Sequence, residues 1–269
     1  MRKRTSREAV PARSEGAVAR GTAEFYYNGD VPRPSPKVPR PLPRSFYDRN
    51  TLTVARELLG SVLARRMEGG EILKGRIVEV EAYVGEEDQA CHARAGRTRR
   101  TDPLYGPPGF AYVYLTYGMH YLLNAVAEPE GKPAAVLIRA VEPVQGIEWM
   151  MRGRAARSRR ENGRERAPSR DGFPVHDLAS GPAKLCQAFG LDLAQNRSDL
   201  LGPEIWIEAG APTPDARVQT SARIGCERAR APWDLIPWRF FESDSPFVTP
   251  GRSPGRNGDS GVRARKNSV

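Results

Sequence analysis

Two glutamates separated by one residue are the first candidates for catalysis in this sequence. Glu79 and Glu81 stand in the segment VEVEAYVG, where apolar residues alternate with charged and aromatic ones. The alternation predicts a β-strand over 71–84 with one apolar face, and with Glu79, Glu81 and Tyr83 on the other face. Because carboxylates that share a strand face repel each other, the pair suggests a chemical use.

The pair of carboxylates admits three interpretations, which the spacing alone does not separate. One carboxylate can act as a general base. Both can join Asp88 and His92 around Mg²⁺ or Mn²⁺ in a nuclease or phosphodiesterase, although three histidines and no compact carboxylate triad make a weak ligand set. The pair can also be a salt-bridged sheet face in a non-catalytic nucleic-acid-binding module. A chelator would abolish only the second activity, and Glu81→Gln would leave the third protein unchanged.

Aromatic and basic residues follow the glutamates and favour contact with nucleic acid. Aromatic rings beside guanidinium groups are suited to stacking on nucleobases. Tyrosines crowd into seventeen positions next to a short arginine cluster: Tyr105, Tyr112, Tyr114, Tyr117 and Tyr121 beside Arg94, Arg97, Arg99 and Arg100.

The last of these tyrosines belong to a predicted hairpin. Two β-prone runs, FAYVYLTY and YLLNAVA, are separated by Gly118, Met119 and His120, so Tyr117 is expected close to the tip. A large aromatic side chain at a hairpin tip exposes apolar surface unless it inserts into something. Wedging between the base steps of a duplex is one such use.

The charge of the chain is unevenly distributed. The 269 residues carry a formal charge of +10, but residues 1–44, 152–170 and 249–269 together hold +16, which leaves −6 for the remainder. A basic balance favours polyanionic partners. The body of the chain must therefore concentrate its basic residues locally if it binds a phosphate backbone.

Composition excludes several other classes of protein. No apolar run approaches the roughly 20 residues that a membrane span needs, and the N-terminus has no apolar segment typical of a secretory signal. Cys91, Cys186 and Cys226 are too few and too widely spaced for a disulfide framework or a zinc knuckle. These features favour a reducing, intracellular compartment.

The pattern along the chain predicts one folded domain over 45–248. Residues 1–44 and 249–269 are expected to be disordered basic tails, and 152–172 a basic flexible insertion. Within the domain we expect a helix capped by Asp48 or Asn50, a strand over 134–143, a helix over 145–151, and a helix after Ser180-Gly181-Pro182, with Ser180 as its cap. Residues 85–109 are predicted to form a long functional loop.

Several of these segments resemble the alkyladenine (3-methyladenine) DNA glycosylase family, whose members release purines during base-excision repair. The resemblance runs from about Phe46 to Phe247. It rests on the segments VEVEAYVGEEDQACH, AYVYLTYGMHYLLN, VLIRAVEP, SGPAKLCQAFG and RIG. The resemblance implies an α+β fold, in which a single compact domain holds a curved antiparallel sheet, flanking helices and a protruding β-hairpin that intercalates into DNA. It also implies that no metal or other cofactor is used.

The same resemblance assigns roles to individual residues. Glu81 matches the general base that activates water, and Arg139 an active-site arginine. Tyr83, His92 and Tyr114 match the walls of the pocket for the flipped base. Asn124 matches the side chain that crowds the 2-amino position of guanine.

Contacts with DNA complete these expectations. Tyr117 matches the intercalating residue, with Met119 beside it. Arg97 and Arg100 are candidates for backbone contacts from the loop, and Lys184 is a candidate at a helix start. The partner implied is double-stranded DNA that contains alkylated or deaminated purines such as 3-methyladenine, 7-methylguanine or hypoxanthine. We expect a monomer, without lyase activity, in a compartment that contains DNA.

Overall fold

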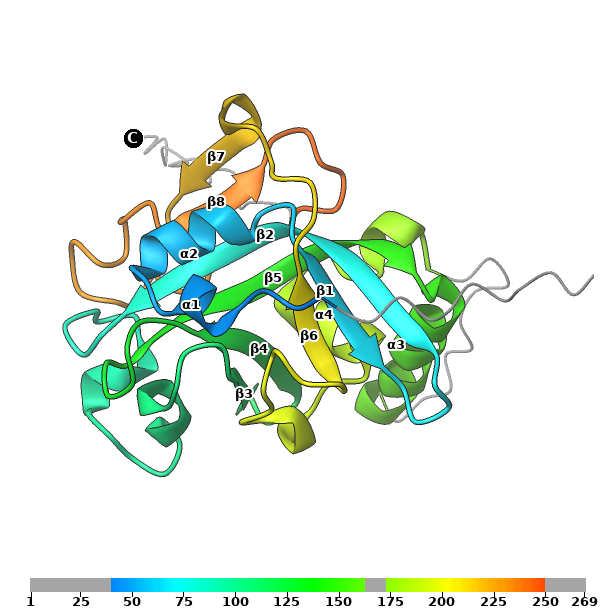
Figure 1. Ribbon diagram of the computed structural model, residues 1–269, viewed down its shortest axis with the longest axis horizontal. Helices are drawn as coiled ribbons and strands as arrows, with labels where there is room; N and C mark the ends of the chain where they lie inside the picture. Colours follow the sequence, from blue (N-terminus) through cyan, green and yellow to red (C-terminus); the bar gives the residue numbers. More distant parts are fainter. Residues whose placement is uncertain (1–39, 163–172, 250–269) are drawn as a thin grey trace, which may run out of the picture. The chain divides into compact units, whose positions relative to one another are not determined.

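The computed structural model describes residues 40–162 and 173–249 (Figure 1). The predictions for the tails over 1–39 and 250–269, and for residues 163–172 of the basic insertion, lie outside the described residues. No helix among the described residues is long and apolar enough to cross a membrane.

The described residues form a mixed α/β fold in a single domain, built on an open antiparallel sheet, as predicted. The order of the main path is β3-β4-β5-β2-β1-β6, and β8 pairs with both β2 and β7. The strands are β1 (Val62–Arg66), β2 (Ile72–Val84), β3 (Ala111–Thr116), β4 (His120–Val126), β5 (Ala134–Gln145), β6 (Ile205–Glu208), β7 (Val218–Ser221) and β8 (Arg239–Glu242).

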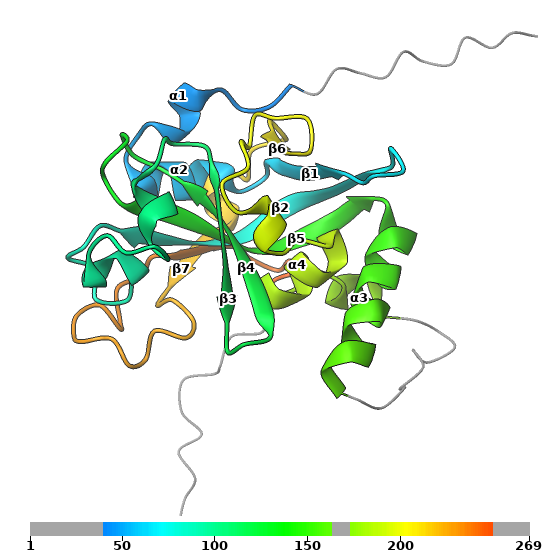
Figure 2. The same ribbon diagram turned by 90° about the horizontal axis from the view of Figure 1, so that it is seen from below.

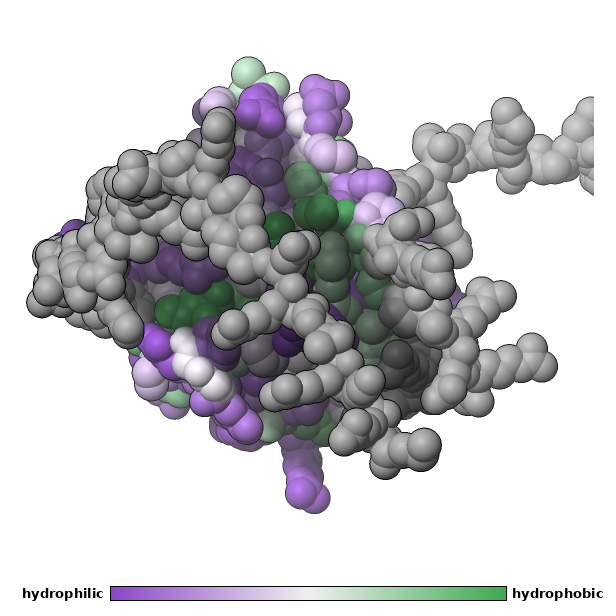
Figure 3. Space-filling view, turned by 90° about the vertical axis from the view of Figure 1, so that its right-hand side faces the viewer, coloured by the Kyte–Doolittle hydropathy of each residue, from purple (hydrophilic) through white to green (hydrophobic). Residues whose placement is uncertain are grey.

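Helices and short turns of 3-10 helix complete the fold. The α-helices are α1 (Arg44–Tyr47), α2 (Thr51–Leu58), α3 (Ile147–Asn162) and α4 (Pro182–Phe189). The 3-10 helices are η1 (His92–Ala95), η2 (Asp102–Tyr105), η3 (Val175–Asp177), η4 (Leu193–Gln195) and η5 (Asp215–Arg217). In Figure 2, α2 lies above β2 and β5, and α4 lies below them. Figure 3, seen from the side of α3, shows apolar residues in the recessed middle of that face and hydrophilic residues along its edges.

The central strand β2 differs from its prediction in one respect. Residues 77–82 are all fully buried, so the face that carries Glu79 and Glu81 is covered as well as the apolar face. Strands β1, β5 and β8 occupy the edges of β2, and α2 packs against it. Groups from other segments contact the glutamates themselves and bury them: Arg139, Arg239 and the backbone amides of Ile224 and Thr249. The two glutamates therefore belong to the interior, where every charge requires a partner.

An irregularity between β2 and β5 brings an arginine to the glutamates. Val80 pairs with Ile138 and Glu79 pairs with Ala140, which leaves Arg139 without a partner residue on β2. Such a bulge redirects the side chain of the extra residue. Arg139 reaches both glutamates from this position.

The predicted hairpin is present as β3 and β4, in register from Ala111↔Ala125 to Thr116↔His120. The Met119 amide donates to the Thr116 carbonyl at 3.1 Å and closes the turn. Tyr117 and Gly118 both have positive φ, at 51° and 69°. Tyr117 is 86% exposed at the tip, as expected.

The helices differ from the predictions at their ends. Asn50 caps α2 with its side chain, as predicted. The helix predicted over 145–151 begins at Ile147 and continues to Asn162, so the first part of the basic insertion is helical. Met150 and Arg154, one turn apart, are both buried, which explains the continuation.

The start of α4 also differs from its prediction. Pro182 occupies the first turn of α4 as expected, but the N-cap is Gly181 and no side chain caps it. Ser180 was expected to cap this helix, and this is wrong. Its hydroxyl donates to Asp177 instead.

Candidate active site

Five residues predicted for the base pocket and the active site line one cavity of about 400 Å³. The cavity lies between the end of β2, the hairpin, β5 and two loops, one around His92 and one over 224–226. The predicted residues that it brings together are Tyr83, His92, Tyr114, Asn124 and Arg139.

One wall of this cavity is a packed aromatic group. The rings of Tyr112 and Tyr114 stack, with centroids 5.3 Å apart and an interplanar angle of 29°. The His92 ring stands edge-on to Tyr114 at 4.4 Å, and His92 Nδ1 lies 2.9 Å from the Tyr112 hydroxyl oxygen. The Asn124 side-chain amide donates to the Tyr112 carbonyl at 3.0 Å. The rings hold one another in place, so they form a preorganised surface for a planar ligand.

Burial sets the protonation of this wall. Desolvation, assisted by Arg100 and Arg94, lowers the pKa of His92 to about 4, so the imidazole is neutral at neutral pH. Desolvation also raises the pKa of Tyr112 to about 12 and that of Tyr114 further. The aromatic wall therefore carries no charge of its own.

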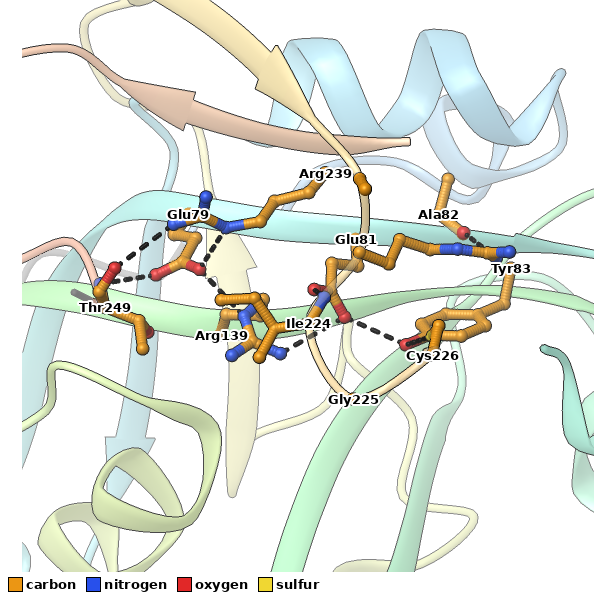
Figure 4. Close-up of polar contacts among 12 residues, drawn as sticks. Glu79, Glu81, Ala82, Tyr83, Arg139, Ile224, Gly225, Cys226, Arg239 and Thr249 are labelled. Carbon is orange, nitrogen blue, oxygen red and sulfur yellow. Dashed lines mark hydrogen bonds and ion pairs between the residues drawn. The ribbon is translucent and has the colours of Figure 1, made fainter. Parts of the chain in front are cut away.

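Glu81 is fully buried behind residues that line the cavity (Figure 4). Its Oε2 accepts a hydrogen bond from the Tyr83 hydroxyl at 2.8 Å and pairs with Arg139 Nη1 at 3.2 Å. Its Oε1 accepts from the Ile224 amide at 2.7 Å. Three groups from β2, β5 and the loop after β7 thus fix the carboxylate.

Glu79 occupies a different environment on the same strand. Its Oε1 accepts from Arg139 Nε at 2.8 Å and Arg239 Nε at 2.7 Å, and its Oε2 accepts from the Thr249 amide at 2.7 Å (Figure 4). Burial raises the pKa of Glu79, but Arg139 and Arg239 outweigh it, and the net pKa lies below its ordinary value. The two arginines balance the two buried glutamates.

A second buried ion pair anchors the loop over 224–226, which borders the cavity. Arg223 binds Asp88 through two bonds of 2.5 and 2.9 Å and also donates to the Ala82 carbonyl at 2.9 Å. Its guanidinium lies 4.7 Å from the centroid of the Tyr83 ring. The next residue, Ile224, supplies the amide that binds Glu81. Arg223 therefore ties this loop to β2 and to Tyr83.

Sequence reasoning gave no role to Arg223, Ile224 or Cys226, although the RIG segment was singled out. Cys226 lines the cavity, and its Sγ lies 3.7 Å from the Tyr83 hydroxyl. These residues lie more than 130 positions after β2, so only their place in the fold joins them to Glu81. The one local signal was an arginine within an otherwise apolar segment.

The contacts of the acidic residues give the metal-site interpretation no support. Glu79, Glu81 and Asp88 each accept from arginine, and together they accept from backbone amides as well. Across residues 40–162 and 173–249, no group of three or more His, Cys, Asp and Glu is arranged to hold a metal ion.

The residues predicted to contact DNA lie outside the cavity or at its edge. Tyr117 is exposed at the hairpin tip and also lines the cavity mouth, and Met119 beside it is 48% exposed. Arg100 lies over the Tyr114 ring, 5.5 Å from its centroid. Arg97 pairs with Asp102 at 2.7 Å, and Lys184 pairs with Asp177. Two of the predicted contacts therefore already have acidic partners.

Comparison with known proteins gives a consistent result. A family model described as methylpurine-DNA glycosylase (MPG) matches residues 45–246. A Myxococcus xanthus protein is 44% identical over 80% of this chain and 96% of its own length. A Methanocella arvoryzae protein is 45% identical over 80% and 98%, respectively. A Chlorobaculum tepidum protein is 43% identical over 78% and 92%. All three are named "Putative 3-methyladenine DNA glycosylase".

Proposed function

The chain belongs to the methylpurine-DNA glycosylase family, and we propose that it removes alkylated or deaminated purines from duplex DNA with Glu81 as the general base. Membership makes it a DNA glycosylase, a hydrolase of N-glycosyl bonds that acts in DNA repair. The substrates we propose are 3-methyladenine, 7-methylguanine and hypoxanthine, in a compartment that contains DNA. We propose that the enzyme acts as a monomer.

The observation that carries this proposal is the position of Glu81 behind an aromatic cavity. An ionised carboxylate can accept about four hydrogen bonds. Tyr83, Arg139 and Ile224 occupy three of these positions. Among the described residues, Oε1 accepts only from the Ile224 amide, so it can accept a further bond from water. A water on Oε1 would be held next to the sugar of a base that occupies the cavity.

The proposed reaction breaks one bond and forms another at the sugar C1′. As the bond from C1′ to the base nitrogen breaks, its electron pair leaves with the base. The water oxygen bonds to C1′, and Glu81 takes the proton. A carboxylate near C1′ also stabilises positive charge that develops on the sugar, as it does in glycoside hydrolysis.

The aromatic wall supports selection of cationic bases. 3-Methyladenine and 7-methylguanine nucleotides carry positive charge, which is attracted to the faces of Tyr83 and Tyr114. Such bases leave without protonation, and a neutral His92 fits a reaction that needs no strong acid. Asn124 lies in the wall, where it would crowd a guanine 2-amino group.

We propose a hydrolytic reaction without a lyase step. A lyase of the Schiff-base type needs an amine at C1′, and no lysine is found among the described residues that line the cavity. Water activated by Glu81 is then the nucleophile. The product is free base and an intact abasic strand.

Contact with the duplex is assigned to the hairpin and the residues around the cavity. Tyr117 and Met119 would fill the gap left by the flipped nucleotide. Arg97, Arg100 and Lys184 would contact backbone phosphates. Arg100 is the best placed of the three, because it forms no ion pair with the described residues, whereas Arg97 and Lys184 do.

Release of free purine from alkylated duplex DNA in EDTA tests the proposal. Wild type should release methylpurine without cutting the strand, and Glu81→Gln should bind the duplex but release almost nothing. Glu87→Gln, which removes the same charge from an exposed position, is the matched control and should behave as wild type. Strand cleavage without base release, or dependence on Mg²⁺, would favour a nuclease instead.

A further inference from the structure

We propose that a second cavity beside the aromatic cavity is a phosphodiester subsite, which binds a backbone phosphate next to the flipped nucleotide through Arg94, Arg100 and Arg228. This subsite rests on the proposed function and belongs to the same active site. Arg228 has no other role in the site described above, and Arg94 acts there only on the pKa of His92.

The second cavity has a volume of about 450 Å³ and adjoins the first. It is formed by the loop that contains η1 and by the loop between β7 and β8. The two cavities share five lining residues: Ala90, Cys91, His92, Gly225 and Cys226. A ligand in one cavity would therefore contact residues that also line the other cavity.

The charge of the second cavity is positive and uncompensated. None of the described residues that line it is acidic. Arg94 and Arg100 donate to the carbonyls of Gln89 and Leu115, which fixes their position without neutralising them. Arg228 is exposed and forms no ion pair within residues 40–162 and 173–249. Arg97, by contrast, lies outside this lining and pairs with Asp102.

The lowered pKa of His92 is a second sign of the positive charge of Arg94 and Arg100. His92 lies in the shared wall, and after desolvation the largest causes of its lowered pKa are Arg100 and Arg94. Their positive charge therefore reaches the wall between the two cavities. An anion in the second cavity would weaken this effect.

Phosphate is the ligand that the chemistry and the connectivity favour together. Guanidinium groups bind phosphate oxygens through paired, charge-assisted hydrogen bonds. A flipped nucleotide stays attached to its strand through the phosphates on either side. If its base fills the aromatic cavity, one of these phosphates lies within reach of the adjoining cavity.

The subsite would connect DNA binding to the catalytic carboxylate. Arg228 stands four residues after Ile224, whose amide binds Glu81, and five after Arg223, which anchors that loop to Asp88. A phosphate held by Arg228 would therefore restrain the loop that positions Glu81. We expect its loss to reduce both affinity and the rate of the chemical step.

Arg228→Ala and Arg230→Ala form a matched pair for the test. Both arginines are exposed and lie on the same loop, but only Arg228 lines the cavity. Binding is measured by fluorescence anisotropy on a duplex that carries a tetrahydrofuran abasic-site analogue, at several salt concentrations. Arg228→Ala should reduce the slope of log affinity against log salt by about 0.9, the value for one phosphate contact, and Arg230→Ala should reduce it less.

A scan of neutral linkages locates the phosphate. Methylphosphonate replaces each phosphodiester near the abasic analogue in turn. One flanking position should weaken wild-type binding by about tenfold and Arg228→Ala binding clearly less, because the variant has already lost one of the three arginine contacts to that phosphate. If both proteins lose equally at every position, or if the two variants have the same salt slope, the subsite is wrong.

The scan is independent of catalysis because it measures binding alone. If wild type has one methylphosphonate-sensitive position but releases no base, the proposed function is wrong and the phosphate subsite stands. If wild type releases base but no position is sensitive, the proposed function stands and the subsite is wrong. Melting temperatures of both variants show whether the loop still folds.

Discussion

Glu79 and Glu81 are the same residue type on the same strand, both are fully buried, and both contact Arg139. Glu79 binds Arg139, Arg239 and the Thr249 amide. Of these three residues, Arg139 lines the aromatic cavity, whereas Arg239 and Thr249 do not. Glu81 is held by three groups that all come from residues lining the aromatic cavity. The role of a buried carboxylate is therefore decided by where its partners lie.

The comparison separates stability from catalysis on one strand. Glu79 joins β2, β5 and β8 to the end of the described chain, so its contacts are those of a structural ion pair. Glu81 joins β2 and β5 to a loop that borders the cavity. Substitutions at the two positions should consequently change different quantities.

The largest effect is expected for Glu81→Gln on the rate of base release. Loss of a general base reduces the chemical step by about 10²–10⁴-fold. The glutamine oxygen can still accept from the Ile224 amide, and its NH2 group can donate to the Tyr83 hydroxyl oxygen. The measurement is single-turnover release of methylpurine at saturating enzyme. A rate within threefold of wild type would remove Glu81 from the mechanism.

Glu79→Gln should instead reduce the free energy of unfolding. Removing one member of a buried ion pair costs about 3–5 kcal/mol because charged partners lose their compensation, and Arg139 and Arg239 are both 5% exposed here. Urea denaturation measures the loss. Base release per folded molecule should fall far less than in Glu81→Gln, and an equal fall would break the comparison.

The loss of stability at low pH tests the structural role of Glu79 further. The pKa of folded Glu79 lies below its ordinary value of 4.5, so its contribution is fully present above that pH and is lost as pH falls through the folded pKa. Glu79→Gln should therefore show a smaller loss of stability on acidification than wild type. A parallel pH dependence in the two proteins would contradict this assignment.

Much of this arrangement could be predicted from sequence, because alternation and turn chemistry are local. The β2 strand, the hairpin with Tyr117 at its tip and the Asn50 cap follow from neighbouring residues. Resemblance to a family then placed Glu81 and Arg139 in one site. The role of Glu79 could not be derived, because its partners include Arg239 and Thr249, which lie 160 and 170 positions away.

The errors have the same physical origin. Only one face of β2 was expected to be apolar, yet the face with the glutamates is buried too, because Arg139, Arg239 and the Thr249 segment contact Glu79. The bulge that frees Arg139 depends on register between two strands and leaves no mark in either segment. Helix α3 continues beyond its predicted end because Arg154 is buried, which the arginine-rich composition did not indicate.

Tyr83 and Tyr117 can be compared in the same way, with a smaller expected effect on stability and binding. Tyr83 is partly buried and bonded to Glu81, whereas Tyr117 is exposed with φ of 51°. A left-handed conformation disfavours most side chains, and asparagine tolerates it better. Tyr117→Asn should raise the free energy of unfolding by up to about 1 kcal/mol, because asparagine relieves part of the roughly 1–2 kcal/mol cost of the left-handed conformation. It should weaken binding to lesion-containing duplex by about tenfold, because the intercalating ring is lost. Thermal melting and anisotropy give the two values, and a variant that loses both would show that Tyr117 serves the fold.

The smallest effect concerns the titration of His92. Its pKa decides whether this imidazole could act beside Glu81 in proton transfer at neutral pH. Burial, Arg100 and Arg94 lower its pKa to about 4, so its imidazole should not titrate between pH 5 and 8. Stability should fall as pH drops from about 6.5 to about 4, because the unfolded chain binds that proton first. NMR of the three histidines, with His92→Gln for assignment, follows the titration. A midpoint for His92 near 6.5 would mean that its imidazole is partly protonated at neutral pH and could act as an acid next to Glu81. The two glutamates alone would then no longer account for proton transfer in the site.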